Sequence, residues 1–169
     1  AMQKAMAQMA TTGAEHAALA RLVGTWDVQA TMWMAPGAPP AISKGSATFT
    51  AVLGGKWIRQ EYTGEMMGKA YTGIGMSGYD TLAKQYVGTW HDDMSTLQST
   101  LTGSSSDGGK IITYTSVMPH CPMTGGPLTH RYVMSMDTND RMVFTMFQQP
   151  QGGAETKGME LVYTRAAKR

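Results

Sequence analysis

Apolar and polar residues alternate along most of the chain from residue 24 onward. In the first such segment, 24–34, every second position is apolar: Trp26, Val28, Ala30, Met32 and Met34. A period of two is typical of a β-strand with one buried face, because successive side chains of a strand point to opposite faces. We therefore predict that this segment is the first strand of a sheet and that these five side chains share its inner face.

About nine further segments alternate in the same way or are rich in β-branched residues. They are residues 46–53, 57–64, 71–79, 86–91, 97–103, 111–118, 129–136, 142–148 and 156–165. The connections are mostly short enough to form hairpins, which favours an antiparallel meander. A twisted meander of this size tends to close, because closure removes its exposed edges. We therefore predict an all-β fold, a single closed antiparallel meander β-barrel of about ten strands that spans residues 24–165.

Residues 1–23 have helical rather than strand periodicity and should form a short N-terminal helical segment. Within residues 1–11, three methionines would share one face of a loosely docked helix: Met2, Met6 and Met9. Thr12 and Glu15 fit a capping box at the start of a helix from about 13 to 23. We expect its apolar stripe to cover one end of the barrel: Ala18, Leu19, Leu22 and Val23.

Segments rich in Gly and Pro mark the longer connections. Residues 36–40 would form a rigid loop near the open mouth of the barrel, and residues 65–69 and 119–127 are also predicted as loops. The fourth predicted strand contains three glycines: Gly73, Gly75 and Gly78. Glycine weakens a strand, so we expect these positions to allow a sharp bend or the close approach of another backbone segment.

Composition limits the classes of protein that fit this pattern. The chain has 169 residues, 42% hydrophobic and 15% charged, which suits one globular domain over residues 1–169. The net charge is +2 without a basic run, so nucleic acid and anionic membranes are not expected partners. A single cysteine excludes an internal disulfide. No signal-peptide pattern is visible, so we expect a cytoplasmic protein, or a periplasmic one if a signal peptide has been removed.

Residues in the first and last predicted strands match the pattern of a known fold family. Gly24-Thr25-Trp26 opens the first strand, and Arg165 closes the last one. This combination resembles the calycins, the group of lipocalin and fatty-acid-binding barrels. The resemblance implies that Trp26 lies inside the closed end of the barrel and that Arg165 packs across it. A guanidinium over an indole face is favourable by about 1–2 kcal/mol when both are desolvated.

A closer resemblance covers nearly the whole chain and points to a bacterial family known only as domain of unknown function 1579. The matching segments are Thr12–His16, Gly24–Trp26, Met32–Met34 with Pro36–Pro40, Gly73–Asp80, Tyr86–Trp90, Pro122–Gly125 and Gly158–Glu160. The resemblance implies a calycin-like fold and supplies no catalytic residues. Around Pro119-His120-Cys121 the chain departs from the acidic pair expected in that family, so any role of this loop would be particular to this protein.

Two groups of residues have side chains that could form a chemical site. His91, Asp92 and Asp93 could form a metal or acid–base cluster, but adjacent strand residues point to opposite faces, so turn capping is favoured. His120 and Cys121 lack the further partners that a zinc or thiol site needs. The chain has no phosphate loop, dinucleotide fingerprint or nucleophile elbow. The sequence therefore predicts no metal, no cofactor and no catalytic residue, and it leaves open whether the protein is an enzyme.

The function that the pattern favours is binding of a small, mainly apolar molecule inside the barrel. The predicted ligand-binding residues are Met32, Met34, Phe49, Tyr62, Trp90, His130, Met134 and Phe144. One alternative is a small-molecule hydrolase or isomerase, which needs a histidine and a carboxylate within hydrogen-bond reach inside the barrel. A second is a haem protein with His91 or His130 as axial ligand. A third is a structural module with a filled interior that forms a homodimer through Trp33 and Val52.

Overall fold

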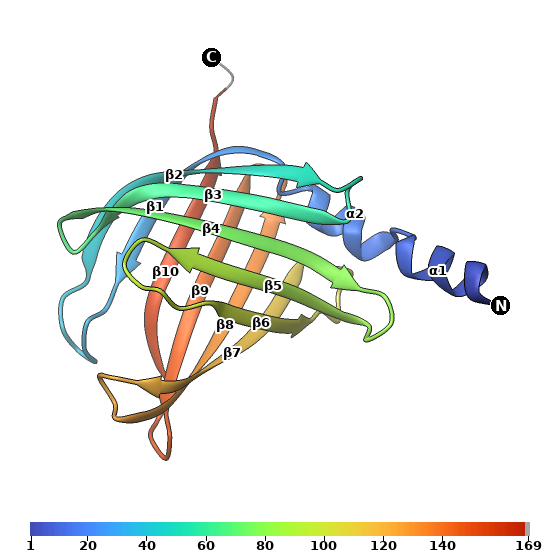
Figure 1. Ribbon diagram of the computed structural model, residues 1–169. Helices are drawn as coiled ribbons and strands as arrows, with labels where there is room; N and C mark the ends of the chain where they lie inside the picture. The colour runs from blue at the N-terminus through green and yellow to red at the C-terminus, as the bar shows by residue number, and fades with distance from the viewer. Residues whose placement is uncertain (168–169) are drawn as a thin grey trace.

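The computed structural model describes residues 1–167, and its ten strands form one closed antiparallel barrel (Figure 1). The elements are α1 (Met2–Ala10), α2 (Ala14–Ala20), β1 (Gly24–Met32), β2 (Ala41–Val52), β3 (Trp57–Met66), β4 (Lys69–Asp80), β5 (Gln85–Asp92), β6 (Ser99–Ser104), β7 (Ile111–Cys121), β8 (Gly126–Thr138), β9 (Arg141–Pro150) and β10 (Thr156–Arg165). Each strand pairs with its neighbours in chain order, and β1 pairs with β10. The predicted meander barrel is confirmed.

Two of the predicted loops are wrong in extent. The segment predicted as a loop at 65–69 is a tight turn at Met67 and Gly68, both of which have a positive φ. The predicted loop at 119–127 is shorter as well, because β7 continues to Cys121 and β8 begins at Gly126. The pairing of β7 with β8 shifts between Met118 and Cys121, where Pro119 has no N–H to give to a ladder. A bulge thus accommodates Pro119 inside the strand, where the sequence predicts a loop.

The N-terminal segment forms two helices. The predicted capping pair of Thr12 and Glu15 is wrong, because Gly13 precedes α2 and its N–H donates to Nδ1 of His16 at 3.1 Å. His16 is buried, and its ring packs edge-on against Tyr79 with 6.0 Å between ring centres. A buried ring in the first turn of α2 therefore fixes where this helix begins.

Helix α2 covers one end of the barrel, as predicted, while α1 extends away from it (Figure 1). Leu19 and Leu22 are 2% exposed, whereas Val23, predicted in the same stripe, is 40% exposed. No residue of α1 is buried, so the predicted docking of this helix is wrong. Within the described part of the chain, no helix is long and apolar enough to cross a membrane.

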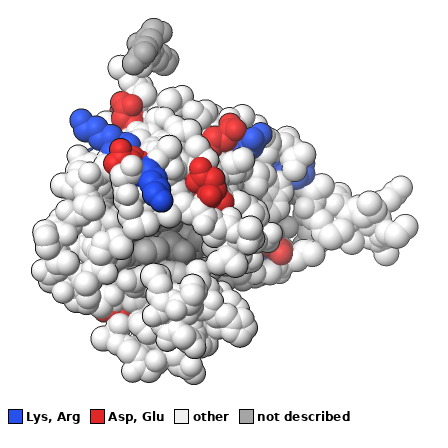
Figure 2. All heavy atoms as spheres, turned by 60° about the vertical axis from the view of Figure 1, so that its left-hand side comes forward, with Lys and Arg blue, Asp and Glu red and all other residues white. Residues whose placement is uncertain are grey.

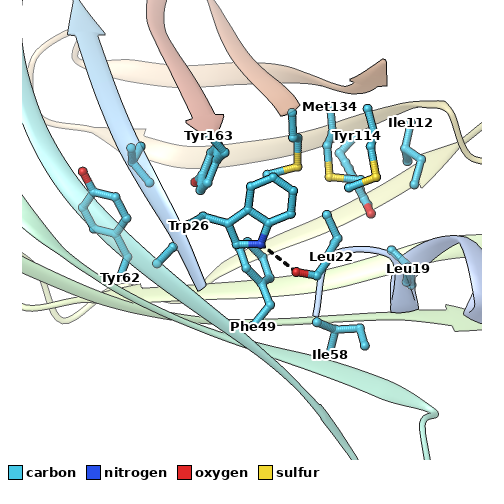
Figure 3. Packing of buried hydrophobic residues seen from close by; sticks show 14 of the residues in the cluster. Leu19, Leu22, Trp26, Phe49, Ile58, Tyr62, Ile112, Tyr114, Met134 and Tyr163 are labelled. Carbon is cyan, nitrogen blue, oxygen red and sulfur yellow. Dashed lines mark hydrogen bonds between the residues drawn. The ribbon is translucent and has the colours of Figure 1, made fainter. Parts of the chain in front are cut away.

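Trp26 plugs the end of the barrel that α2 covers, as the calycin resemblance implied. Its side chain is fully buried, and its Nε1–H donates to the backbone oxygen of Leu22 at 2.7 Å (Figure 3). The guanidinium of Arg165 lies 4.2 Å from the centre of the indole ring. Trp26 and Arg165 also face each other in the β1–β10 ladder, so the contact fixes the register in which the barrel closes.

The glycines of β4 make room for an aromatic ring. A Cβ atom added to Gly73 would lie 2.1 Å from Cζ2 of Trp90, and one added to Gly75 would lie 3.0 Å from the same indole. Gly75 and Trp90 are direct partners in the β4–β5 ladder. The predicted close approach of another backbone segment is wrong at these two positions, because the approaching group is the Trp90 side chain. Because Gly73 and Gly75 have no Cβ atom, Trp90 can lie flat along the inner wall.

Candidate functional site

A cavity of about 290 Å³ occupies the interior of the barrel. Leu22 lines it at the end that α2 covers, and Met32, Asp92 and Met159 line it near the opposite ends of their strands. Figure 2 shows the face of the molecule that carries the connections β1–β2, β3–β4 and β5–β6, and this face is hollowed. The volume lies close to the lower limit of about 300 Å³ for small-molecule sites. The interior is not filled, so the predicted structural module with a filled interior is wrong.

Aromatic and thioether side chains form most of the wall. The aromatic residues are Phe49, Tyr62, Tyr71, Trp90, Tyr114, Tyr132, Phe144 and Tyr163, and the methionines are Met32, Met66, Met76, Met134, Met142, Met146 and Met159. Methionine side chains are flexible and polarisable, so they adapt to occupants of different shape. The wall is therefore apolar over most of its area and adaptable along β8, β9 and β10.

Six of the eight residues predicted to bind a ligand line this cavity. They are Met32, Phe49, Tyr62, Trp90, Met134 and Phe144. Met34 does not, because β1 ends at Met32 and the Met34 side chain is 63% exposed in the following turn. His130 shares the inward-facing row of β8 with Tyr132, but its ring stacks on Tyr132 at 5.9 Å and does not line the cavity.

One polar pair lies within the cavity wall. The Gln60 amide donates to the hydroxyl oxygen of Tyr163 at 3.2 Å. Burial raises the pKa of Tyr163 well above its usual value, although the hydrogen bond from Gln60 acts in the opposite direction. The phenol therefore stays protonated at neutral pH and keeps a hydrogen to donate.

A second polar group, which the sequence analysis missed, joins Tyr71, Trp90 and Asp92. The indole N–H of Trp90 donates to the Tyr71 hydroxyl at 3.1 Å, and that hydroxyl donates to Oδ2 of Asp92 at 3.3 Å. Burial raises the pKa of Tyr71; the Trp90 hydrogen bond lowers it, and the Asp92 carboxylate raises it further. The sequence pattern could have predicted Asp92 as a lining residue. It lies two residues after Trp90 in the same strand, so the two side chains point to the same face.

The His91–Asp92–Asp93 segment does not converge on a metal. His91 is exposed and contacts the Gln98 side chain through Nε2 at 3.2 Å. Asp93 accepts hydrogen bonds from the backbone N–H and the hydroxyl of Thr72, and these hold its pKa below the usual value. Within residues 1–167, no group of three or more His, Cys, Asp or Glu side chains is placed to hold a metal ion. The preferred interpretation, turn capping, is confirmed for Asp92, whose Oδ1 accepts a hydrogen bond from the backbone N–H of Met94 at 3.1 Å, whereas Asp93 bonds to the neighbouring strand.

His120 and Cys121 lie in β7 and do not form a joint site. Cys121 is 2% exposed, whereas His120 is exposed. Burial raises the pKa of the Cys121 thiol, but hydrogen bonds from Thr124 and Met123 outweigh this and hold it below the usual value. Because adjacent strand residues point to opposite faces, the imidazole is not available to this thiol.

The geometry required by the hydrolase or isomerase alternative is not found in the part of the chain that the structure covers. There, His16 accepts a hydrogen bond from Gly13 and His91 contacts Gln98. No histidine of residues 1–167 has a hydrogen bond or ion pair with a carboxylate. The haem alternative required His91 or His130 to face the ligand, and neither of them lines the cavity.

Comparison with known proteins agrees with this fold. The chain is similar to the crystal structure of Rv2717c from M. tuberculosis, with 15% identity, a TM-score of 0.60 and coverage of 93% of this chain and 100% of that one. It is also similar to the S-type phycobiliprotein lyase CPES from Guillardia theta, with 10% identity, a TM-score of 0.62 and coverage of 95% and 97%. Both likenesses concern the fold, which is calycin-like as predicted. No curated protein matches the sequence.

The family resemblance seen in the sequence motifs is confirmed over most of the chain. The model of the family described as "Protein of unknown function (DUF1579)" matches residues 11–165. The match begins before α2 and ends at Arg165, so it includes the whole barrel and the helix that covers it. The chain belongs to the DUF1579 family.

Proposed function

We propose that this protein binds a small, mainly apolar molecule inside its barrel. The observation that carries the proposal is the cavity of about 290 Å³, whose wall is built mostly of aromatic rings and methionines. Sites for small molecules combine such apolar walls with a few fixed polar groups that orient the ligand. Gln60 with Tyr163, and Tyr71 with Asp92, supply such groups.

Six of the residues predicted from the sequence are proposed to contact the ligand. They are Met32, Phe49, Tyr62, Trp90, Met134 and Phe144. Trp90 also reports on binding, because an occupant beside the indole changes its fluorescence. The rings of Tyr132 and Phe144, stacked at 5.3 Å, supply a flat apolar surface on the wall opposite to β3 and β4 in the strand order.

The test is a titration with N-phenyl-1-naphthylamine, a neutral apolar molecule that becomes fluorescent when it leaves water. We expect saturable binding to the wild-type protein with one site per chain. The variant Ser99→Phe should weaken it at least about tenfold, because Ser99 lines the cavity and a ring there takes the space of the probe.

The matched control is Thr100→Phe, one residue further along β6, where the side chain is exposed. This variant should bind the probe as the wild-type protein does. Absence of saturable binding to the wild-type protein would refute the proposal. Equal weakening by both phenylalanines would place the probe outside the barrel and refute it as well.

A further inference from the structure

The cavity has a one-sided distribution of charge. Among its lining residues in the described chain, Glu65 and Asp92 are acidic, and none is lysine, arginine or histidine. Glu65 is exposed at the mouth, whereas Asp92 is half-buried at the end of β5. Building on the proposed function, we propose that the molecule bound in the cavity carries a positive charge: an ammonium group on an apolar body, held beside Asp92.

Asp92 has acceptor capacity left for such a group. Its Oδ2 accepts from the Tyr71 hydroxyl at 3.3 Å, and its Oδ1 accepts from the backbone N–H of Met94 at 3.1 Å. A carboxylate has about four acceptor sites, so two hydrogen bonds leave room for an N–H donor. These two bonds also fix the orientation of the carboxylate, so that it need not reorganise when a cation arrives.

Aromatic side chains are linked to the same carboxylate through the Tyr71 hydroxyl. The Tyr71 ring packs edge-on against Tyr62 at 5.8 Å, and its hydroxyl joins Trp90 to Asp92. The faces of tyrosine and tryptophan rings attract cations, and such rings recognise quaternary ammonium groups in other proteins. Two tyrosines, a tryptophan and a carboxylate together provide the chemistry that a protonated or quaternary amine requires.

An anionic ligand, such as the fatty-acid carboxylate bound by barrels that the chain resembles, lacks a partner here. Of the cations on the barrel strands, Arg59, Arg131 and Lys157 pair with glutamates outside the cavity. Arg165 donates to backbone carbonyls at the closed end. A carboxylate placed near Asp92 would be repelled, and no cation of the cavity wall compensates it in the described chain.

The experiment displaces bound N-phenyl-1-naphthylamine at pH 7 with four molecules that share an eight-carbon chain. They are octylammonium, octyltrimethylammonium, octan-1-ol and octanoate. We expect octylammonium to displace the probe about tenfold better than octan-1-ol, a difference of about 1.4 kcal/mol, and octanoate to displace it worst. Octyltrimethylammonium carries the same charge without an N–H group. Its displacement of the probe shows whether aromatic ring faces are enough to bind the cation or whether a hydrogen bond to Asp92 is needed.

Variants at two neighbouring residues identify the side chain that favours octylammonium over octan-1-ol. Asp92→Asn removes the charge, and its single amide oxygen can still accept from the backbone N–H of Met94 while its NH2 group replaces the oxygen that faces the Tyr71 hydroxyl. This variant should abolish the advantage of octylammonium over octan-1-ol. Asp93→Asn removes the same charge one residue further on, where the side chain bonds to Thr72 on the outer face, and should keep that advantage. Unchanged displacement by octan-1-ol shows that both variants are folded.

The outcomes separate this inference from the proposed function. If the probe does not bind the wild-type protein, the proposed function fails. If the probe binds and octanoate displaces it as well as octylammonium does, binding stands and the inference of a cationic ligand is overturned. An equal loss of preference in both asparagine variants would overturn the role of Asp92.

Discussion

The guanidinium of Arg165 lies 4.2 Å from the centre of the Trp26 ring, and the two residues are direct partners in the β1–β10 ladder. The same guanidinium donates to the backbone oxygens of Arg21, Val23 and Asn139 at 2.7–2.9 Å. One side chain thus connects the first strand, the end of α2 and the turn between β8 and β9. This arrangement makes Arg165 a structural cross-link at the closed end of the barrel.

We expect Arg165→Lys to lower the free energy of unfolding by about 2 kcal/mol. A lysine keeps the charge, but its compact ammonium lacks the planar fork that reaches several carbonyls and lies flat on an indole. Urea denaturation followed by circular dichroism measures the change. The control is Arg59→Lys, because the guanidinium of Arg59 is exposed and pairs with Glu61 at 2.9 Å. This exchange should lower the free energy of unfolding by less than about 0.5 kcal/mol. Equal losses in the two variants would contradict the role of Arg165 as a cross-link.

The glycines of β4 give a second prediction. Gly73→Ala should destabilise the protein by about 1–3 kcal/mol, because the new methyl group would lie 2.1 Å from the Trp90 ring and force it to move. Urea denaturation measures the loss, and the fluorescence spectrum of the folded protein should shift as Trp90 changes its surroundings. Gly126→Ala serves as the control, since the nearest atom to its new methyl group is 3.8 Å away. A stable Gly73→Ala variant with an unchanged spectrum would contradict the close packing.

The closure of the barrel could be predicted because its determinants repeat along the chain. The period of two persists from Trp26 to Arg165, and short connections leave few topologies other than a meander. The contact between these two residues followed from the resemblance to calycins. The structure also places Phe49, Trp90 and Phe144 on the cavity wall, although the alternation and Trp26 indicate an inward face for the first strand alone.

The remaining details depend on contacts that a local pattern does not encode. Alternation continues to Met34, but the chain leaves the sheet after Trp33, whose N–H donates to the oxygen of Gly158 on β10. Thr12 and Glu15 match a capping pattern, yet the helix starts where His16 becomes buried. In both cases a partner distant in the sequence decides where the element begins or ends.

Leu22 gives a third prediction, which concerns stability and cavity size together. It is 2% exposed and lines the end of the cavity that α2 covers. Leu22→Ala should lower the free energy of unfolding by about 2–5 kcal/mol, because removed methyl groups leave a space that the surroundings fill only in part. Denaturation in urea measures this loss, and the enlarged cavity should bind probes bulkier than N-phenyl-1-naphthylamine more tightly. Leu53→Ala, at a position that is 70% exposed, should change neither property. Tighter binding of bulky probes by Leu53→Ala would contradict the position of the cavity.

The pH dependence of stability provides the last prediction, through His130 on β8. Burial lowers the pKa of His130 below its ordinary value of 6.5, so the folded state binds its proton less readily than the unfolded state does. As the pH falls through 6.5, the unfolded chain takes up this proton first, and the free energy of unfolding decreases. His130→Gln should therefore flatten the dependence between pH 7.5 and pH 5.5, measured by urea denaturation at both values. His120→Gln, at an exposed position of β7, should leave the slope unchanged. Parallel curves for the wild-type protein and His130→Gln across this interval would show that His130 does not resist protonation in the fold.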